Sequence, residues 1–308
     1  MSDTLSWVKK ADLVLDDLKN NGGLLTPQQN NRFIKKLIDS PTILASARTV
    51  PMSSNTQKIN KIGIGQRILR RANEGVALTE AERHKVATEQ IELNAFEFIA
   101  EGRIGYETIE ENIEGDAFIQ TYLDLVAEQA SADIEELIIN GDTASPDNYL
   151  AAFDGVVKRA TRHQVDAAGA PISRAVFNAG YKAMPTAYRK NRQKLKWFMT
   201  PNDEADYMEA LGDRQTALGD AYTTGAAPLR AMGIATQAAA YLPEGHMFLT
   251  NPKNLLVGVR RKFTLESERL ISERVIKFVL TCRIAFQIEE LDAIVQVRQL
   301  GDAADQPA

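Results

Sequence analysis

Hydrophobic residues between positions 116 and 140 follow the longest helical pattern in the chain. They recur every three or four residues and share one side of a helix: Phe118, Ile119, Tyr122, Leu123, Val126, Ala130, Ile134, Leu137 and Ile138. No proline or glycine interrupts them, and Asn140-Gly141 predicts a left-handed cap. We expect one helix, well beyond the average length in globular proteins. Its other face is acidic and is expected to meet solvent: Asp124, Glu128, Asp133, Glu135 and Glu136.

Residues 49–88 lack the hydrophobic positions of a core and are rich in residues that break helices. Isoleucines alternate there with basic side chains, namely Lys58, Lys61, Arg67, Arg70 and Arg71. This composition is compatible with a long two-stranded excursion. An isolated hairpin is marginally stable in water, so another surface has to receive it. The alternative is an ordinary surface loop, but so long a loop is uncommon in a compact domain.

Alternating and helical patterns share the rest of the chain. Residues 5–18 and 26–40 predict two short helices with too few apolar residues for a core of their own. Period-two runs predict strands at 89–103, 194–199, 233–242, 248–249, 255–259, 275–286 and 293–300. Helical patterns predict helices at 171–191 and 201–214, and 218–231 is expected to be a loop. The mixture predicts an α+β protein with two modules, one of them split along the sequence.

Charge and cysteine usage exclude several classes of protein. The 308 residues carry a formal net charge of -5, without the basic excess of a tight nucleic-acid binder. The single cysteine, Cys282, lies in an apolar strand pattern and is expected to be a small buried hydrophobe. No apolar run approaches the length of a membrane span, and the first residues do not resemble a secretory signal. We expect a protein made in a reducing cytosol.

The sequence contains none of the common catalytic motifs. GxSxG, HExxH, Walker and CxxC patterns are absent. His84, His163 and His246 lack the spacing of metal ligands. Acidic pairs such as Glu289-Glu290 are interpreted as solvated side chains. We expect no catalytic residue, no cofactor and no metal site, and therefore no enzyme.

Several segments follow one another in an order that a known family shares. IELNAFEFIAEGRIGYETIEEN leads as a strand and turn into the long helix FIQTYLDLVAEQASADIEELIINGD. FDGVV and AMPTAYRKNRQKLKWFMTPNDEADYMEALGDRQTALGD then give a short opening segment and a helix, strand and helix. PLRAMGIATQAAAYLPEGHMFLTNPKNLLVGVRRKFTLESER gives a sheet, and CRIAFQIEELDAIVQVRQL gives the closing strands. In this order they resemble the major capsid proteins of tailed bacteriophages, which have the Hong Kong 97-type fold. The resemblance covers residues 49–300 and rests on the order of the elements.

The resemblance implies how the chain is divided. In that α+β fold a long spine helix belongs to a peripheral domain, and an axial domain surrounds the symmetry axes of the shell. The implied parts are an amino-terminal arm (1–45), an extended loop (46–90), a peripheral domain with the spine helix (91–142), an axial domain (143–264), closing strands of the peripheral domain (265–300) and a flexible tail (301–308). The extended loop would reach over a neighbouring subunit.

The resemblance also implies a function. Copies of the chain would form pentamers and hexamers of an icosahedral head around double-stranded DNA, assembled in the host cytoplasm and retained in the virion. The implied partners are a portal protein, packaged DNA through weak non-specific contact, and in some members scaffolding and decoration proteins; no membrane is implied. Two alternatives stay open: an encapsulin-type nanocompartment shell, which shares the fold, and a less favoured soluble α+β enzyme.

Charge indicates how the excursion would meet a neighbour. Its basic residues are expected to lie on the acidic helix face of another subunit. The expected contact residues are Lys58, Lys61, Arg67, Arg70 and Arg71 on one side and Asp124, Glu128, Asp133 and Glu136 on the other. Each surface pair contributes about 0–1 kcal/mol, so many copies have to act together. Some family members join a loop lysine covalently to a neighbour's asparagine, but no such asparagine is identified here, and non-covalent contact is preferred.

Overall fold

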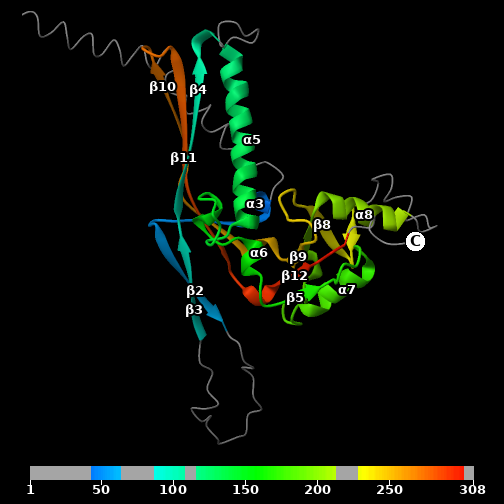
Figure 1. The fold of residues 1–308 in the computed structure, drawn as a ribbon. Helices are drawn as coiled ribbons and strands as arrows, with labels where there is room; N and C mark the ends of the chain where they lie inside the picture. The colour runs from blue at the N-terminus through cyan, green and yellow to red at the C-terminus, as the bar shows by residue number, and fades with distance from the viewer. Residues whose placement is uncertain (1–42, 64–86, 108–115, 213–227, 302–308) are drawn as a thin grey trace, which may run out of the picture.

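The computed structural model describes residues 43–63, 87–107, 116–212 and 228–301. Within these ranges an elongated lobe and a compact lobe lie side by side, and a narrow hairpin projects from the elongated lobe (Figure 1). The elongated lobe contains a four-stranded sheet and the compact lobe a six-stranded sheet. The largest cluster of buried hydrophobic residues joins the two lobes, because it combines Ile284 of the first sheet with Phe198 and Phe248 of the second. The α+β class predicted from the sequence is confirmed.

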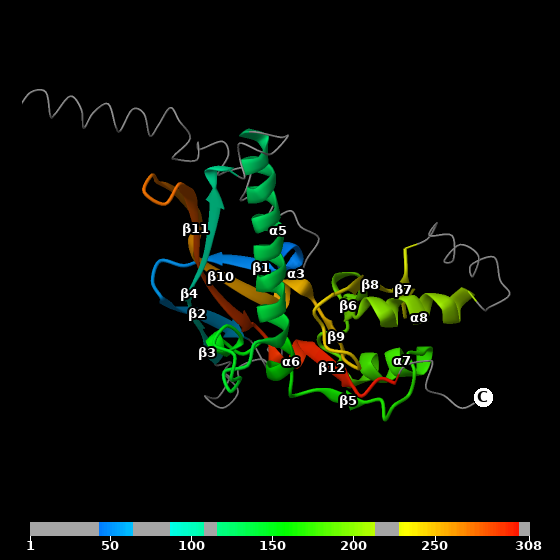
Figure 2. The same ribbon diagram turned by 45° about the horizontal axis from the view of Figure 1, so that its top comes forward.

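The elongated lobe is a twisted sheet with a long helix, α5 (Asp116–Asn140), lying along it (Figure 2). The strands are ordered β1 (Arg48–Pro51), β10 (Leu255–Leu270), β11 (Val275–Ile288) and β4 (Phe96–Gly105). Side chains alternate between the two faces of a strand, and in β11 those at Ile276, Phe278 and Leu280 are buried while their neighbours are half-exposed. One face of the sheet therefore supplies half of this core.

Helix α5 supplies the other half, and its bounds match those predicted from the hydrophobic pattern. Leu137 and Ile138 are buried, and the Tyr122 ring centre lies 5.8 Å from that of Phe278. The acidic face predicted for this helix is wrong at Glu135, which is buried. Its Oε1 atom accepts a hydrogen bond of 3.2 Å from the backbone N–H of Ile43, in the short helix α3 (Ile43–Ser46). A neighbouring element thus covers this part of the helix.

The end of α5 differs from the predicted left-handed cap. Gly141 is not among the residues with a positive φ. It is needed for space instead, because a Cβ atom there would meet the carbonyl oxygens of Phe153 and, at 2.6 Å, Leu137. The backbone N–H of Gly155 donates to the carbonyl of Gly141 at 2.7 Å, and a Cβ at Gly155 would in turn meet Ile139. Two backbone segments cross here at a distance that only glycine allows.

Gly141→Ala tests this crossing. The added methyl group meets backbone atoms that cannot turn away, so we expect the free energy of unfolding to fall by about 3 kcal/mol, the upper end for overpacking. Gly258→Ala is the control, since its Cβ meets the Met52 side chain, which is flexible, and we expect a loss of about 1 kcal/mol. Urea denaturation of the unassembled subunit measures both. Equal losses would contradict the close approach at Gly141.

A two-stranded hairpin extends from the elongated lobe. Strands β2 (Thr56–Gly63) and β3 (Ala87–Asn94) pair antiparallel along their whole length. In the described part of the hairpin the core lies at the base, where Leu93 is buried with Ile59 and Ile91 beside it. The two-stranded excursion predicted from the sequence is confirmed for these strands, and residues 64–86 lie outside the described ranges.

The compact lobe has its own sheet and helices. The strands are ordered β5 (Gln164–Asp166), β12 (Ile294–Arg298), β9 (Met247–Thr250), β6 (Lys196–Met199), β8 (Ile234–Ala238) and β7 (Arg230–Ala231). Three helices accompany them: α6 (Val156–Arg159), α7 (Arg174–Ala183) and α8 (Pro201–Gly212). Phe177 of α7 packs against Trp197 of β6 and Tyr207 of α8. These aromatic rings fix both helices to the sheet.

Three predicted bounds are corrected. Helix α7 stops at Ala183 rather than 191, because Pro185 follows and disfavours helical backbone at the residue before it. Strand β10 runs to Leu270 rather than 259, since β11 pairs with it over its full length. The expected closing strands, 265–300, do not stay in one sheet: β12 pairs with β9 and β5 in the compact lobe.

Candidate assembly surfaces

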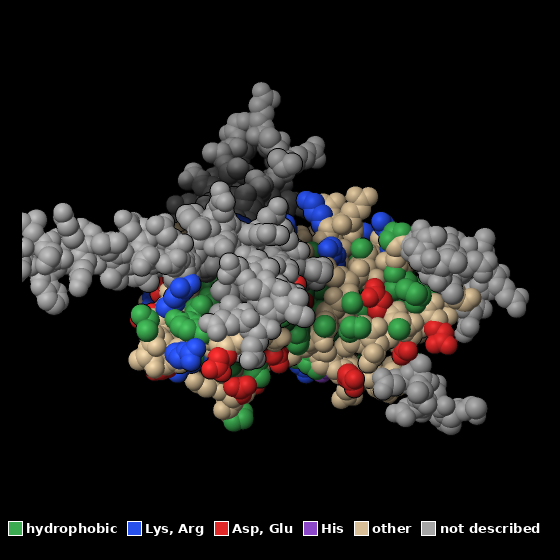
Figure 3. Space-filling model, turned by 90° about the horizontal axis from the view of Figure 1, so that it is seen from above, with side chains coloured by type: hydrophobic (Ala, Val, Ile, Leu, Met, Phe, Trp, Pro, Cys, Tyr) green, Lys and Arg blue, Asp and Glu red, His purple; other side chains and the backbone are tan. Residues whose placement is uncertain are grey.

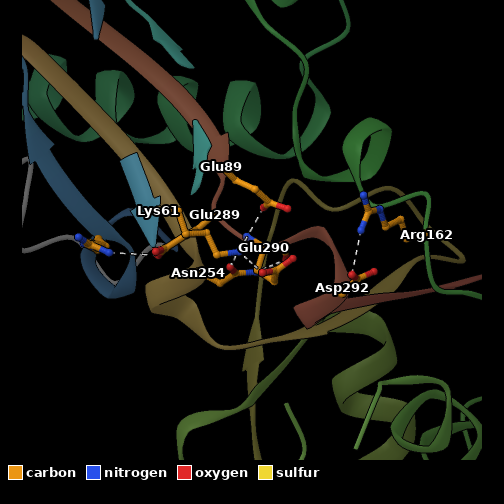
Figure 4. A network of polar contacts seen from close by, with 8 residues as sticks. Lys61, Glu89, Arg162, Asn254, Glu289, Glu290 and Asp292 are labelled. Carbon is orange, nitrogen blue, oxygen red and sulfur yellow. Dashed lines mark hydrogen bonds and ion pairs between the residues drawn. The ribbon is translucent and has the colours of Figure 1, made fainter. Parts of the chain in front are cut away.

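The base of the hairpin is tied to the loop that connects the two lobes. Lys61 of β2 forms an ion pair with Glu290, and Glu89 of β3 lies 3.8 Å from the same ammonium group (Figure 4). The Lys61 and Glu290 side chains are only 24% and 21% exposed. Partial burial limits screening by solvent, so this pair is stronger than an ordinary surface pair. It is the only ion pair among the described residues that joins the hairpin to the loop after β11.

That loop lies where the chain crosses from one sheet to the other. The β9–β10 connection and the β11–β12 connection meet at Asn254, whose side chain is buried. The backbone N–H of Glu290 donates to Asn254 Oδ1 at 2.8 Å, and Asn254 Nδ2 donates to the carbonyl of Glu290 at 2.9 Å. Arg48 of β1 pairs with Glu289 at 3.1 Å. The crossing is therefore held by paired polar groups, and the hairpin is anchored to it.

A polar cleft of ≈ 830 Å³ opens between the hairpin base and the compact lobe. It is lined by Lys61, Glu89, Arg162, Tyr188, Glu290 and Asp292. Arg162 donates to Asp292 at 2.8 Å, and this hydrogen bond lowers the pKa of the Asp292 carboxyl. The main charges are thus satisfied within the chain. Among the described residues, no three His, Cys, Asp or Glu side chains are placed to hold a metal ion.

Lys61→Met tests the ion pair at the hairpin base. It leaves the half-buried Glu290 without its partner, so we expect the free energy of unfolding to fall by about 1.5–3 kcal/mol. Lys58→Met is a matched control on the same strand, because Lys58 is exposed and should tolerate the change within about 0.5 kcal/mol. Urea denaturation of the unassembled subunit compares the two. Indistinguishable midpoints would show that the pair contributes nothing.

The acidic face of α5 is retained in part. Glu128 is exposed, and Asp133 accepts a hydrogen bond from Gln129 at 2.7 Å. Burial raises the pKa of the Tyr149 hydroxyl, and the charges of Asp133 and Glu136 add to the effect. These carboxylates therefore act on the same side of the helix. The side chain of Asp124 is outside the described part of the structure.

The contact predicted between the hairpin and a neighbouring α5 stays a prediction. Lys58 is exposed and open to such a contact, whereas Lys61 is engaged within its own chain. Arg67, Arg70 and Arg71 lie outside the described residues. The sequence reasoning missed Glu290 as the partner of Lys61, and Asn254 as the residue that holds the Glu290 backbone. Glu289-Glu290 had been interpreted as a solvated pair, but the connection from β11 to β12 places Glu290 beside Lys61 and Glu289 beside Arg48.

Cys282 is confirmed as a buried hydrophobe. Its side chain is 5% exposed within β11, and burial raises the pKa of the thiol to about 12. A thiol with so high a pKa is protonated at neutral pH and a poor nucleophile. A catalytic cysteine has the opposite character.

Glu135→Gln should remove part of the pH dependence of stability. Burial raises the pKa of the Glu135 carboxyl, so the folded state holds its proton more tightly than the unfolded state. Stability is then lost as pH rises from the ordinary carboxyl pKa through the raised one. Glutamine keeps an acceptor for the Ile43 N–H, so we expect Glu135→Gln to melt at a higher temperature than the unsubstituted chain at pH 8 and at the same temperature at pH 4. A lower melting temperature at pH 8 would contradict this.

Comparison with known proteins decides the family. No family model matches the chain. The prophage capsid protein YqbE of Bacillus subtilis strain 168 is 41% identical over 303 residues, which cover 94% of this chain and 96% of that protein. The chain belongs to the phage capsid protein family. An identity of this size over almost the full length indicates that the two chains share one fold.

Solved structures agree with this capsid fold. A chain of the procapsid of satellite phage P4, a structure that includes the size determination (Sid) protein, matches over 98% of this chain and 99% of its own length. The TM-score is 0.66 and the identity is 15%. A chain of a solved structure from Mycobacterium phage Adephagia matches over 86% of this chain and 91% of its own length, with a TM-score of 0.59 and 14% identity. A chain of the capsid of the empty GTA particle matches over 85% of this chain and 90% of its own length, with a TM-score of 0.57 and 15% identity. At these identities the likeness is one of fold, and it confirms the Hong Kong 97-type architecture of this capsid protein.

Proposed function

We propose that this chain is the major capsid protein of a phage head and assembles with copies of itself into an icosahedral shell. The observation that carries the proposal is the 41% identity to a prophage capsid protein across 94% of the chain. The encapsulin-type alternative is not favoured, because both the relative and the structural matches reported above are of phage or phage-like particles.

We propose that the two lobes have the roles of the family's two domains. The elongated lobe, with α5 and the four-stranded sheet, is the peripheral domain, and the six-stranded lobe is the axial domain that surrounds the five-fold and six-fold axes. Residues 1–45 form the arm, 46–90 the extended loop and 301–308 the tail. Since β12 lies in the six-stranded sheet, the boundary moves: 255–288 belongs to the peripheral domain and 289–300 to the axial domain.

The hairpin gives this assembly a physical mechanism. Among the described residues its core lies at the base, and an isolated two-stranded hairpin is marginally stable in water, so contact with a neighbouring subunit would stabilise it. The exposed Lys58 offers positive charge to the exposed Glu128 of a neighbour's α5. Single contacts of this kind are weak, and closure of a symmetric shell makes each one intramolecular and raises its effective concentration.

The proposed partners and location are those of a subunit of a phage head. Portal protein, scaffolding protein and decoration proteins are the proposed partners, together with packaged double-stranded DNA. Assembly takes place in the host cytoplasm and the chain remains in the virion. The function is structural and not enzymatic, and no helix among the described residues is long and apolar enough to cross a membrane.

Sedimentation velocity of the purified full chain tests the proposal. A shell subunit is expected to give fast particles, at least tens of times the mass of the 34.0 kDa chain, under conditions that favour assembly. Dilution into low salt should shift mass between these particles and small oligomers without intermediates of arbitrary size, because closed symmetric shells are cooperative. A single boundary at monomer or dimer mass under every condition would refute the proposal.

A further inference from the structure

A surface of the compact lobe is basic, in contrast with the chain as a whole. Between Asp166 and Asp203 the sequence contains no Asp or Glu, although the chain carries a net charge of -5. The same stretch holds these basic residues: Arg174, Lys182, Arg189, Lys190, Arg192, Lys194 and Lys196. The central ones lie in residues 189–194, between α7 and β6, which we name the basic turn. So local an excess of one sign needs a physical explanation.

The two arginines of the basic turn share one aromatic ring. The guanidinium carbon of Arg192 lies 4.8 Å from the ring centre of Tyr181, and that of Arg189 lies 5.5 Å from it. Arg192 Nε also donates a hydrogen bond of 2.9 Å to Tyr181 Oη. Each cation gains from the ring, but two neighbouring cations repel each other. An anion bound between them would remove this repulsion.

No carboxylate of the described chain forms an ion pair with the basic turn. The ion pairs formed among the described residues all lie elsewhere. Lys190 and Lys194 are exposed and line a cleft of ≈ 430 Å³ with Glu289 and Glu290. Those two carboxylates are already paired, with Arg48 and Lys61. The positive charge of the turn is therefore open to a partner.

On the face of the compact lobe that Figure 3 shows, the charges are separated by sign. In the right half of the space-filling view, which shows this lobe, Lys and Arg side chains gather toward the upper edge and Asp and Glu side chains toward the lower edge (Figure 3). Such a separation creates a directional field, which attracts a polyanion to one side of the lobe.

We propose that the basic turn contacts the phosphate backbone of double-stranded DNA on the inner face of the shell, an inference that rests on the proposed function. Within residues 189–194 every side chain is Lys, Arg, Asn or Gln, the types that contact phosphates. Cores of protein–protein interfaces are instead depleted of lysine and rich in aromatic residues. Because the turn supplies few charges, binding to each subunit is weak and depends on salt, and many subunits act together.

Binding of a 30-base-pair DNA duplex to the full-length unassembled subunit, followed by fluorescence anisotropy, tests the contact. We expect Lys190→Gln/Lys194→Gln to weaken binding at least about tenfold at 50 mM salt and to reduce the slope of log K against log salt by about 2. Arg261→Gln/Arg274→Gln removes the same charge from the elongated lobe and should leave binding unchanged. Equal effects of both variants, or tighter binding of a polyglutamate peptide than of DNA, would overturn the proposal; the latter would indicate an acidic protein partner.

Labelling of a cysteine in closed shells tests whether the basic turn faces the inside of the shell. Lys194→Cys introduces an exposed thiol, and Cys282 gives little background because it is buried. A 5-kDa maleimide reagent should label this variant in free subunits and not in closed shells. Labelling of intact shells would place the basic turn outside and contradict the inference. Shells that form normally while DNA binding is unaffected would leave the proposed function standing and sink only the DNA contact.

Discussion

Replacing residues 62–88 with an Asn-Gly turn is expected to leave a folded subunit that no longer forms closed shells. Lys61 and Glu89 face each other in register, so a two-residue turn can join the two strands there. The core at the hairpin base, with Leu93, Ile59 and Ile91, is kept. The replacement keeps the strand pairs from Thr56 and Asn94 to Lys61 and Glu89, and it removes the rest of the extended loop. We expect at least a tenfold fall in assembled mass by sedimentation velocity. The far-UV circular dichroism spectrum should still be that of a folded α+β subunit.

The control separates length from charge. Lys58→Gln keeps the whole hairpin and removes one exposed charge, so it should weaken assembly only slightly, by about 0–1 kcal/mol per contact. Shells formed in normal yield by the shortened chain would mean that the hairpin does not join subunits. The account would then have to place the main intersubunit contact in another part of the chain.

Phe177→Ala is expected to destabilise the compact lobe by about 3–5 kcal/mol. The Phe177 side chain is fully buried, with ring centres 5.0 Å from Trp197 and 4.7 Å from Tyr207. Its removal opens a cavity between α7, β6 and α8. Domains are stable by only about 5–15 kcal/mol in total, so this is a large share. Urea denaturation of the unassembled subunit, followed by circular dichroism, gives the change in midpoint.

Phe177→Leu is the matched variant. It retains most of the side-chain volume and should lose about 1.5 kcal/mol or less. If the alanine variant unfolds within 1 kcal/mol of the unsubstituted chain, the aromatic cluster does not hold α7 and α8 to the sheet. If both variants lose equally, the shape of the ring matters and its volume does not.

Local patterns predicted the elements whose hydrophobic spacing is most regular. The stripe along α5 has one period over seven turns, and no other structure satisfies it, so the predicted bounds were met. The pattern of β11 predicted the strand, and its apolar character predicted the burial of Cys282. In these elements a side chain's neighbours along the sequence decide which face it occupies.

Long-range pairing was not accessible from the same patterns. The five residues of β12 do not indicate which sheet the strand joins, because four consecutive ones are buried and neither face is distinguished, unlike the alternating β11. The burial of Glu135 depends on α3, ninety-two residues earlier, and Gly141 depends on the backbone at Phe153 and Gly155. The hairpin base was predicted as a contact region, but the partner of Lys61 within the chain requires the crossing at Asn254. These features are set by topology.

Cryo-electron microscopy of the purified, assembled full-length chain tests the central claim most directly. The account predicts closed shells of uniform size, built of pentamers and hexamers, in which the hairpin β2–β3 of one subunit lies on the α5 face of the next, with Lys58 near Glu128. A preparation that yields only monomers or dimers, or shells in which every hairpin folds back on its own subunit, would contradict it.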